Sequence, residues 1–209
     1  MSATSTLAIL REPLEAIGFR KRSGRIFTLE LGPDVLGWLG MNTASRHQAA
    51  GSVEVNPVVG VRHQVVERLV AELRREKFHL YQPPTVCTPL GYEMPEGRYR
   101  AWILTRDPDP APGASLVGAV TRHGLPFMRR LAGMESLCAA AEQGLGFNLE
   151  YRLPVVRLLL GRAREAQAAL DEDIARLGAR EDVAAAQLRA FAGEFSARLA
   201  DGSLGQLRT

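Results

Sequence analysis

The fold is decided by the stretch from Ile26 to Leu73, which reads IFTLELGPDVLGWLGMNTASRHQAAGSVEVNPVVGVRHQVVERLVAEL. In its first part, apolar residues recur at every second position, as with Phe27 and Leu29 on either side of Thr28. This alternation is typical of a strand with one buried face. From Val65 onward the apolar residues are three and four positions apart, which predicts an amphipathic helix. We therefore expect a sheet whose buried face is covered by this helix.

Four segments of the chain have the composition of strands. They span residues 26–31, 36–42, 53–61 and 100–106. The turn residues Gly32 to Asp34 join the first two segments in a hairpin. In the third, Asn56-Pro57 predicts a bulge or a sheet edge, because proline has no N–H to donate to a ladder. In the fourth, the alternation places Trp102 and Leu104 on one face.

The character of the chain changes at the segment DPDPAPGAS, after which every predicted element is helical. The sequence therefore predicts an α+β protein: an antiparallel sheet of about four strands covered by helices, followed by an all-helical C-terminal subdomain. The sheet domain spans residues 1–106, the connection 107–113 and the helical subdomain 114–209. A helical hairpin has little core of its own, so we expect the subdomain to pack on the sheet domain.

The charges of the chain nearly balance, because its 209 residues include 26 basic and 23 acidic side chains. The formal net charge is +3, although the sequence pI is 9.2. Only Lys21 and Lys77 are lysines, a bias that we attribute to a GC-rich bacterial genome. The basic clusters at Arg20 to Arg25 and at Arg129-Arg130 offer little further basic surface for a nucleic-acid backbone. Nucleic-acid binding is therefore the third and least favoured hypothesis.

The cysteines indicate the compartment in which the protein works. Cys87 and Cys138 lie far apart and fit neither a disulfide framework nor a pair of metal ligands. The N-terminus has no early positive charge and only a short apolar run, and no stretch approaches the roughly 20 apolar residues of a membrane span. We expect a cytoplasmic protein that does not interact with a membrane.

Several catalytic signatures are missing from the sequence. It contains no GxGxxG, no phosphate loop that ends in Gly-Lys-Ser/Thr, no GxSxG and no HExxH. The acidic groups at 171–173 and 181–182 have charged neighbours on predicted helices, which is typical of solvated faces. We expect no cofactor and no metal site. Catalytic groups can also come from distant parts of a sequence, so enzymatic activity stays open, with a non-enzymatic role favoured.

One group of residues could form a ligand site on the sheet. Its members are Trp38 between two glycines and the cations and histidines Arg46, His47, Arg62 and His63. Arg62 and His63 fall where a strand gives way to a helix, and a helix N-terminus beside cations can hold an anion. Histidine also supplies a proton carrier near neutral pH. Trp38 also has a simpler interpretation, as a core residue.

A second candidate is the segment from Phe78 to Tyr99, which is rich in proline and tyrosine. Its aromatic residues favour an ordered loop laid across the sheet. Exposed rigid aromatic side chains are good anchors in protein interfaces, so Tyr81 and Tyr92 are candidate partner-binding residues. In the same segment we interpret Cys87 as a packing residue, because no neighbouring histidine could activate it.

The sequence from Tyr151 to Leu177 resembles one helical hairpin of the tetratricopeptide type. The likeness rests on Leu160-Gly161 at the turn and on Leu170 in the second helix, while Asp173 stands where that family places a small residue. A solenoid needs about three repeats to bury a continuous core, and the chain has no second copy. We therefore expect a packing hairpin and not a peptide-binding array.

The N-terminal half resembles an uncharacterised bacterial domain family. In that family a helix ends in Leu-Gly-Phe, a basic residue follows, and a strand with Phe comes next. Here the likeness is carried by IGFRK at 17–21 and by Ile26-Phe27. The resemblance implies a similar fold and no activity.

Two functional hypotheses rank above nucleic-acid binding. The first is a non-enzymatic protein-binding or accessory protein, of the kind that acts as an immunity partner. The second is a small-ligand-binding protein or an enzyme that uses the basic and histidine residues on the sheet. The oligomeric state stays open.

Overall fold

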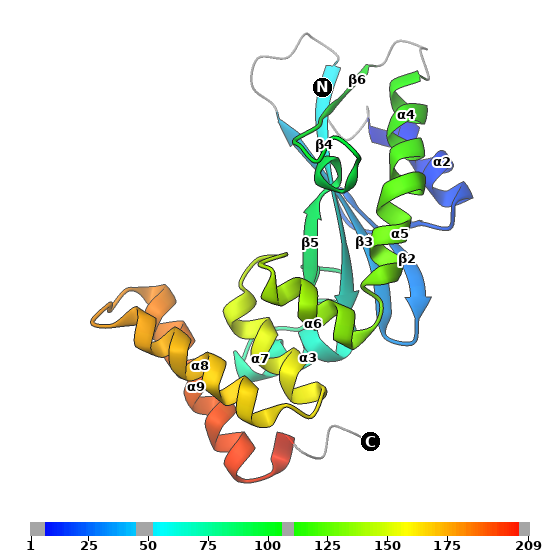
Figure 1. Cartoon of the computed structure of the whole chain (residues 1–209). Helices are drawn as coiled ribbons and strands as arrows, with labels where there is room; N and C mark the ends of the chain where they lie inside the picture. Colours follow the sequence, from blue (N-terminus) through cyan, green and yellow to red (C-terminus); the bar gives the residue numbers. More distant parts are fainter. Residues whose placement is uncertain (1–6, 45–51, 106–110, 205–209) are drawn as a thin grey trace. The chain divides into compact units, whose positions relative to one another are not determined.

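The computed structural model describes residues 7–44, 52–105 and 111–204, and Figure 1 shows its helices and strands. Contacts within the chain divide it into two compact units. The first unit contains Met1–Arg62 and Tyr81–Ala132, and the second contains His63–Leu80 and Gly133–Thr209. The protein is α+β as predicted, and each unit is assembled from segments that are distant in the sequence.

The first unit is built on an antiparallel sheet. Its strands are β1 (Arg20–Lys21), β2 (Ile26–Gly32), β3 (Val35–Ala44), β4 (Ser52–His63), β5 (Val86–Pro89) and β6 (Trp102–Thr105). They lie in the order β1-β2-β3-β4-β5, and β6 pairs with β4. The four strands that the sequence predicts correspond to β2, β3, β4 and β6. The short strands β1 and β5 bring the number in the described residues to six.

Strand β5 lies in the segment that the sequence predicts to be a loop across the sheet. It pairs antiparallel with β4, and Gly60 is the partner of Cys87. A Cβ atom on Gly60 would lie only 2.3 Å from the carbonyl oxygen of Val86. The glycine therefore allows a close approach that another residue would prevent. The sequence shows the glycine but not which segment comes against it, so the prediction missed this strand.

Helices α2 (Arg11–Ala16), α4 (Ala111–Ala119) and α5 (Leu125–Arg130) pack on the sheet of this unit. The helix η1 (Leu7–Leu10) precedes α2, and a π-helical turn, η3 (Val120–Gly124), joins α4 to α5. The indole Nε1 of Trp102 donates to Ser115 of α4 over 3.3 Å, and Trp102 and Leu104 are buried beneath that helix. On the other face of β6, Ile103 is 61% exposed. The predicted alternation in this strand is therefore confirmed.

The division into units differs from the predicted division at residues 107–113. Helix α4 begins within that segment, at Ala111, and both α4 and α5 belong to the unit of the sheet. The cause is packing, because Leu116, Phe127 and Met128 of these helices are fully buried in the core of that unit. A Pro/Gly-rich segment marks a loop in the chain, but it does not show which core the next helix joins.

Strand β4 changes its pairing partner in the middle. Residues Ser52–Val55 pair with β6, and Val58–Val61 pair with β5. Asn56 and Pro57 fall between these two ladders, so the missing N–H of the proline interrupts no ladder on that edge. The Oδ1 atom of Asn56 is buried and accepts no hydrogen bond from the described residues.

The second unit is helical. It contains α3 (Gln64–Leu73), α6 (Met134–Glu142), α7 (Leu149–Leu159), α8 (Ala163–Leu177) and α9 (Val183–Ala200). The sequence predicts that α3 covers the sheet; the structure assigns α3 to the second unit, where it packs against α7 and α9. An apolar stripe predicts that a helix is covered, but not by what. Among the described residues, no helix combines the length and the apolar composition that crossing a membrane requires.

The predicted hairpin at 151–177 is present as α7 and α8, which pack against each other. Gly161 lies at the turn with φ of +85°, a left-handed conformation that favours glycine. The carboxylate of Asp182 accepts a hydrogen bond of 3.1 Å from the backbone N–H of Ala185 and so caps the N-terminus of α9. The resemblance to the tetratricopeptide family stays a prediction.

Candidate functional site

Two of the residues predicted to bind a ligand on the sheet donate hydrogen bonds to a segment of the backbone. The indole Nε1 of Trp38 donates to the carbonyl oxygen of Tyr81 over 2.9 Å, and the guanidinium of Arg62 donates to the carbonyl oxygen of Pro83. Trp38 is 9% exposed and Arg62 is 1% exposed. Trp38 also packs with Val58 and Cys87 in a small apolar cluster. These side chains hold residues 81–83 in place.

The other members of the predicted ligand site are Arg46, His47 and His63. Arg46 and His47 lie outside the described residues. His63 is buried, and it is the first residue of the second unit. The ligand site on the sheet therefore stays a prediction.

The two tyrosines predicted to bind a partner have different surroundings. Tyr81 is half-buried, and the guanidinium of Arg22 lies 4.3 Å from the centre of its ring. Tyr92 lies on the 3-10 helix η2 (Leu90–Glu93) and is 52% exposed. Of these two residues, Tyr92 is the one whose ring is available to a partner.

A better candidate site lies beside η2, on the outer face of β6. Ile103 is directly opposite Glu54 of β4, so their side chains share this face. The hydroxyl of Tyr99 donates to Oε1 of Glu54 over 3.1 Å. The ring of Tyr99 is 55% exposed, and Ile103 is more exposed still. A large aliphatic side chain and a tyrosine are thus presented together to solvent.

A hollow of about 360 Å³ adjoins this face. It is lined by Gly91, Glu96, Arg98, Tyr99, Arg100 and Ala101. A Cβ atom on Gly91 would lie 2.3 Å from the carbonyl oxygen of Arg98, so η2 and the segment 98–100 are in very close contact. This contact supports the backbone that carries Tyr99. We refer to Glu54, Arg98, Tyr99, Arg100 and Ile103 as the β6 surface.

The charged side chains that line the hollow are Glu96, Arg98 and Arg100, which leaves an excess of one positive charge there. The guanidinium of Arg100 lies 3.8 Å from the carboxylate of Glu96 and 5.1 Å from the ring of Trp102. Arg98 makes no ion pair or hydrogen bond through its side chain among the described residues. The lining of the hollow thus contains one carboxylate and two guanidinium groups.

The hydroxyl of Tyr99 keeps its proton at neutral pH. Burial of the hydroxyl raises the pKa of Tyr99, and the hydrogen bond to the Glu54 carboxylate raises it further. The hydroxyl is therefore a hydrogen-bond donor at neutral pH, and its acceptor is the Glu54 carboxylate. It has no feature of a general base.

The described residues bear on two kinds of chemistry, that of a metal site and that of a reactive thiol. No group of three His, Cys, Asp or Glu residues there could hold a metal ion. Cys87 and Cys138 are both buried free thiols. Burial and the Glu142 carboxylate raise the pKa of the Cys138 thiol, which keeps it protonated and unreactive.

Sequence reasoning missed most of the β6 surface for a physical reason. The alternation in the fourth predicted strand already placed Ile103 opposite to the face of Trp102 and Leu104. The register that sets Ile103 beside Glu54, and the bond from Tyr99, depend on pairing between residues almost 50 positions apart. A single sequence does not contain that register.

In comparisons with known proteins, no protein-family model, no curated protein and no solved structure matches this chain.

Proposed function

We propose that this protein is a non-enzymatic accessory protein that binds another protein through the β6 surface. The observation that carries the proposal is the exposure of Ile103 and Tyr99 side by side, next to two arginines. Tyrosine and arginine are enriched among the residues that dominate protein interfaces. An exposed aliphatic side chain at the centre of such a group gains free energy when a partner covers it. Tyr92, on the neighbouring η2, extends the apolar area that a partner could cover.

An immunity-type role, in which the protein occupies and blocks its partner, belongs to this proposal. The free cysteines and the arginine-rich composition support a reducing bacterial cytoplasm as its location. Ligand binding on the sheet has less support, because Trp38 and Arg62 are engaged with the carbonyl groups of 81–83.

The proposal is tested by purifying the full-length tagged protein from its native host and measuring the eluate by native mass spectrometry. The variants are Ile103→Asp and Tyr99→Ala, which remove the two exposed apolar groups. The matched control is Val183→Asp, which places the same charge on a residue that is 73% exposed in the second unit.

We expect one stoichiometric protein companion with the wild type and with Val183→Asp, and its loss with Ile103→Asp and Tyr99→Ala. A companion that stays bound to both β6 variants would exclude this surface. A bound small molecule without any protein companion would favour the ligand-binding alternative.

A further inference from the structure

The backbone of β6 has one edge that no described strand occupies. In the described residues β6 pairs with β4 alone, and residues 102–105 make no backbone hydrogen bond outside that ladder. Half of the N–H and C=O groups of an edge strand point away from its neighbour. These groups can form a ladder with an extended segment of another chain.

Side chains beside this edge favour a particular kind of segment. Ile103 offers an apolar contact on the outer face, next to the ring of Tyr99. Arg98 and Arg100 line the hollow that follows, where Glu96 is the one carboxylate in the lining. A segment that brings a second carboxylate would balance the charge of this hollow.

The residues that line the hollow lead directly into β6, so the hollow lies close to the start of the β6 edge. Ile103 and Arg100 are three residues apart in the sequence, and a strand advances about 3.3 Å per residue. A bound strand with an apolar side chain beside Ile103 would therefore reach the hollow roughly two to four residues further along.

We propose that the partner adds an extended, acidic segment to the free edge of β6, with an apolar residue against Ile103 and a carboxylate in the hollow of Arg98 and Arg100. This inference rests on the proposed function, for which it supplies the binding mode and the chemistry of the partner. The positive excess in the hollow favours an acidic segment over the 98 to 105 segment of a second copy, because that segment carries the same arginines.

The test uses short random peptides displayed on phage and selected on the full-length protein. One selected peptide is then synthesised, and its affinity is measured by fluorescence anisotropy. We expect an enriched pattern that contains an apolar residue and an Asp or Glu two to four positions away. Affinity is expected to fall by at least about tenfold with Ile103→Asp and with Arg98→Glu, and to be unchanged with Val183→Asp.

The backbone ladder is tested on the peptide itself, so that no variant has to fold. Each amide in turn is N-methylated, which removes its N–H donor. Because alternate N–H groups of a strand point to the same neighbour, methylation at every second residue should weaken binding by roughly tenfold or more. Methylation at the intervening residues should have little effect.

The outcomes separate this inference from the proposed function. The proposed acidic strand would be overturned by peptides whose binding requires Ile103 but shows no alternating effect of methylation, or no dependence on Arg98. The β6 surface would still be a binding site in that case. Failure to enrich any peptide that depends on Ile103 would also overturn the acidic strand. Loss of the native companion with Ile103→Asp would still uphold the proposed function in that case.

Discussion

At the scale of single residues, the second unit is held by a buried ion pair. Arg152 Nε donates to Glu67 Oε1 over 2.7 Å, and Arg152 Nη2 donates to Glu67 Oε2 over 3.0 Å. The side chain of Arg152 is only 5% exposed and that of Glu67 only 4%. Arg152 also donates to the carbonyl oxygen of Phe147 over 2.7 Å. The pair therefore fixes both α3 and the start of α7.

Replacement of one partner in this pair should be costly. In Glu67→Ala the Arg152 charge stays buried without its carboxylate, so we expect the free energy of unfolding to fall by about 3–5 kcal/mol. Urea denaturation followed by circular dichroism measures this loss. The control Glu135→Ala removes the carboxylate of an exposed pair with Arg162 and should cause a much smaller loss. Equal losses in the two variants would contradict the structural role of Glu67.

At the scale of elements, the pairing of β5 depends on the absence of a side chain at Gly60. Gly60→Ala should force β4 and β5 apart, because its Cβ would meet the Val86 carbonyl, and we expect a loss of about 1–3 kcal/mol by urea denaturation. Gly32→Ala is the matched control, since a Cβ there would have no atom within 4 Å. A Gly60→Ala protein as stable as the control would show that β5 is not held in this register.

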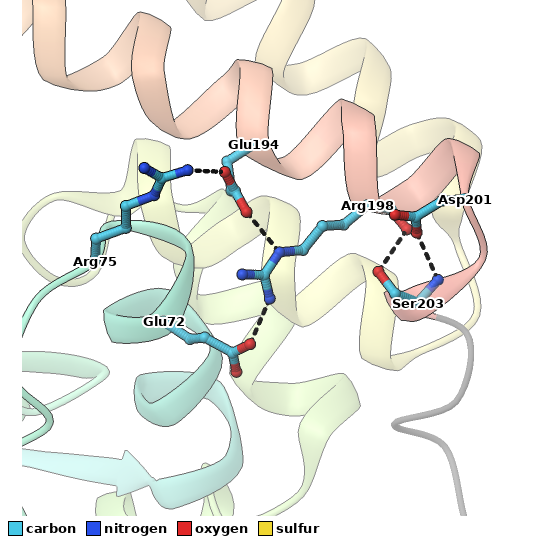
Figure 2. A network of polar contacts seen from close by, with 6 residues as sticks. All are labelled: Glu72, Arg75, Glu194, Arg198, Asp201 and Ser203. Carbon is cyan, nitrogen blue, oxygen red and sulfur yellow. Dashed lines mark hydrogen bonds and ion pairs between the residues drawn. The ribbon is translucent and has the colours of Figure 1, made fainter.

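Helix α9 is joined to α3 by a network of charges, which Figure 2 shows. Arg198 donates to Glu194 over 2.7 Å and also to Glu72, while Arg75 donates to Glu194 over 2.9 Å. The hydrogen bonds from Arg198 and Arg75 hold the pKa of Glu194 below its ordinary value.

This lowered pKa makes the network sensitive to acid. A carboxylate with a lower pKa in the folded state than in the unfolded state stabilises the fold above its unfolded pKa, and this stability is lost as the pH falls toward the folded pKa. Between about pH 7 and about pH 3.5, wild type should lose more unfolding free energy than Glu194→Gln. The control Glu172→Gln, which removes an exposed carboxylate without an ion pair among the described residues, should behave like wild type. An identical pH dependence of wild type and Glu194→Gln would contradict the network.

At the scale of the whole molecule, the sequence predicts elements better than it predicts their neighbours. The strands β2, β3, β4 and β6 and the α7–α8 hairpin follow from periodicity and turn residues, because these signals are local. The packing of α3 against α7 and α9, and the pairing of β5, depend on contacts between distant segments. Periodicity states only that a face is buried.

The same limit applies to the site. Tyr92 is exposed as a partner-binding residue requires, whereas Trp38 and Arg62 bind carbonyl groups that no sequence pattern identifies. The exposure of Ile103 follows from the alternation in β6. Ile103 becomes part of a candidate site because Tyr99 and the hollow lie beside it, and this arrangement exists only in the folded chain.

The most direct test of the central claim is hydrogen exchange of the full-length protein, free and bound to its native companion. If the companion binds the β6 surface, amides of residues 98–105 should become protected on binding, while those at the turn between α8 and α9 should exchange as before. Protection confined to the second unit, with 98–105 unchanged, would contradict the assignment of the binding site to β6.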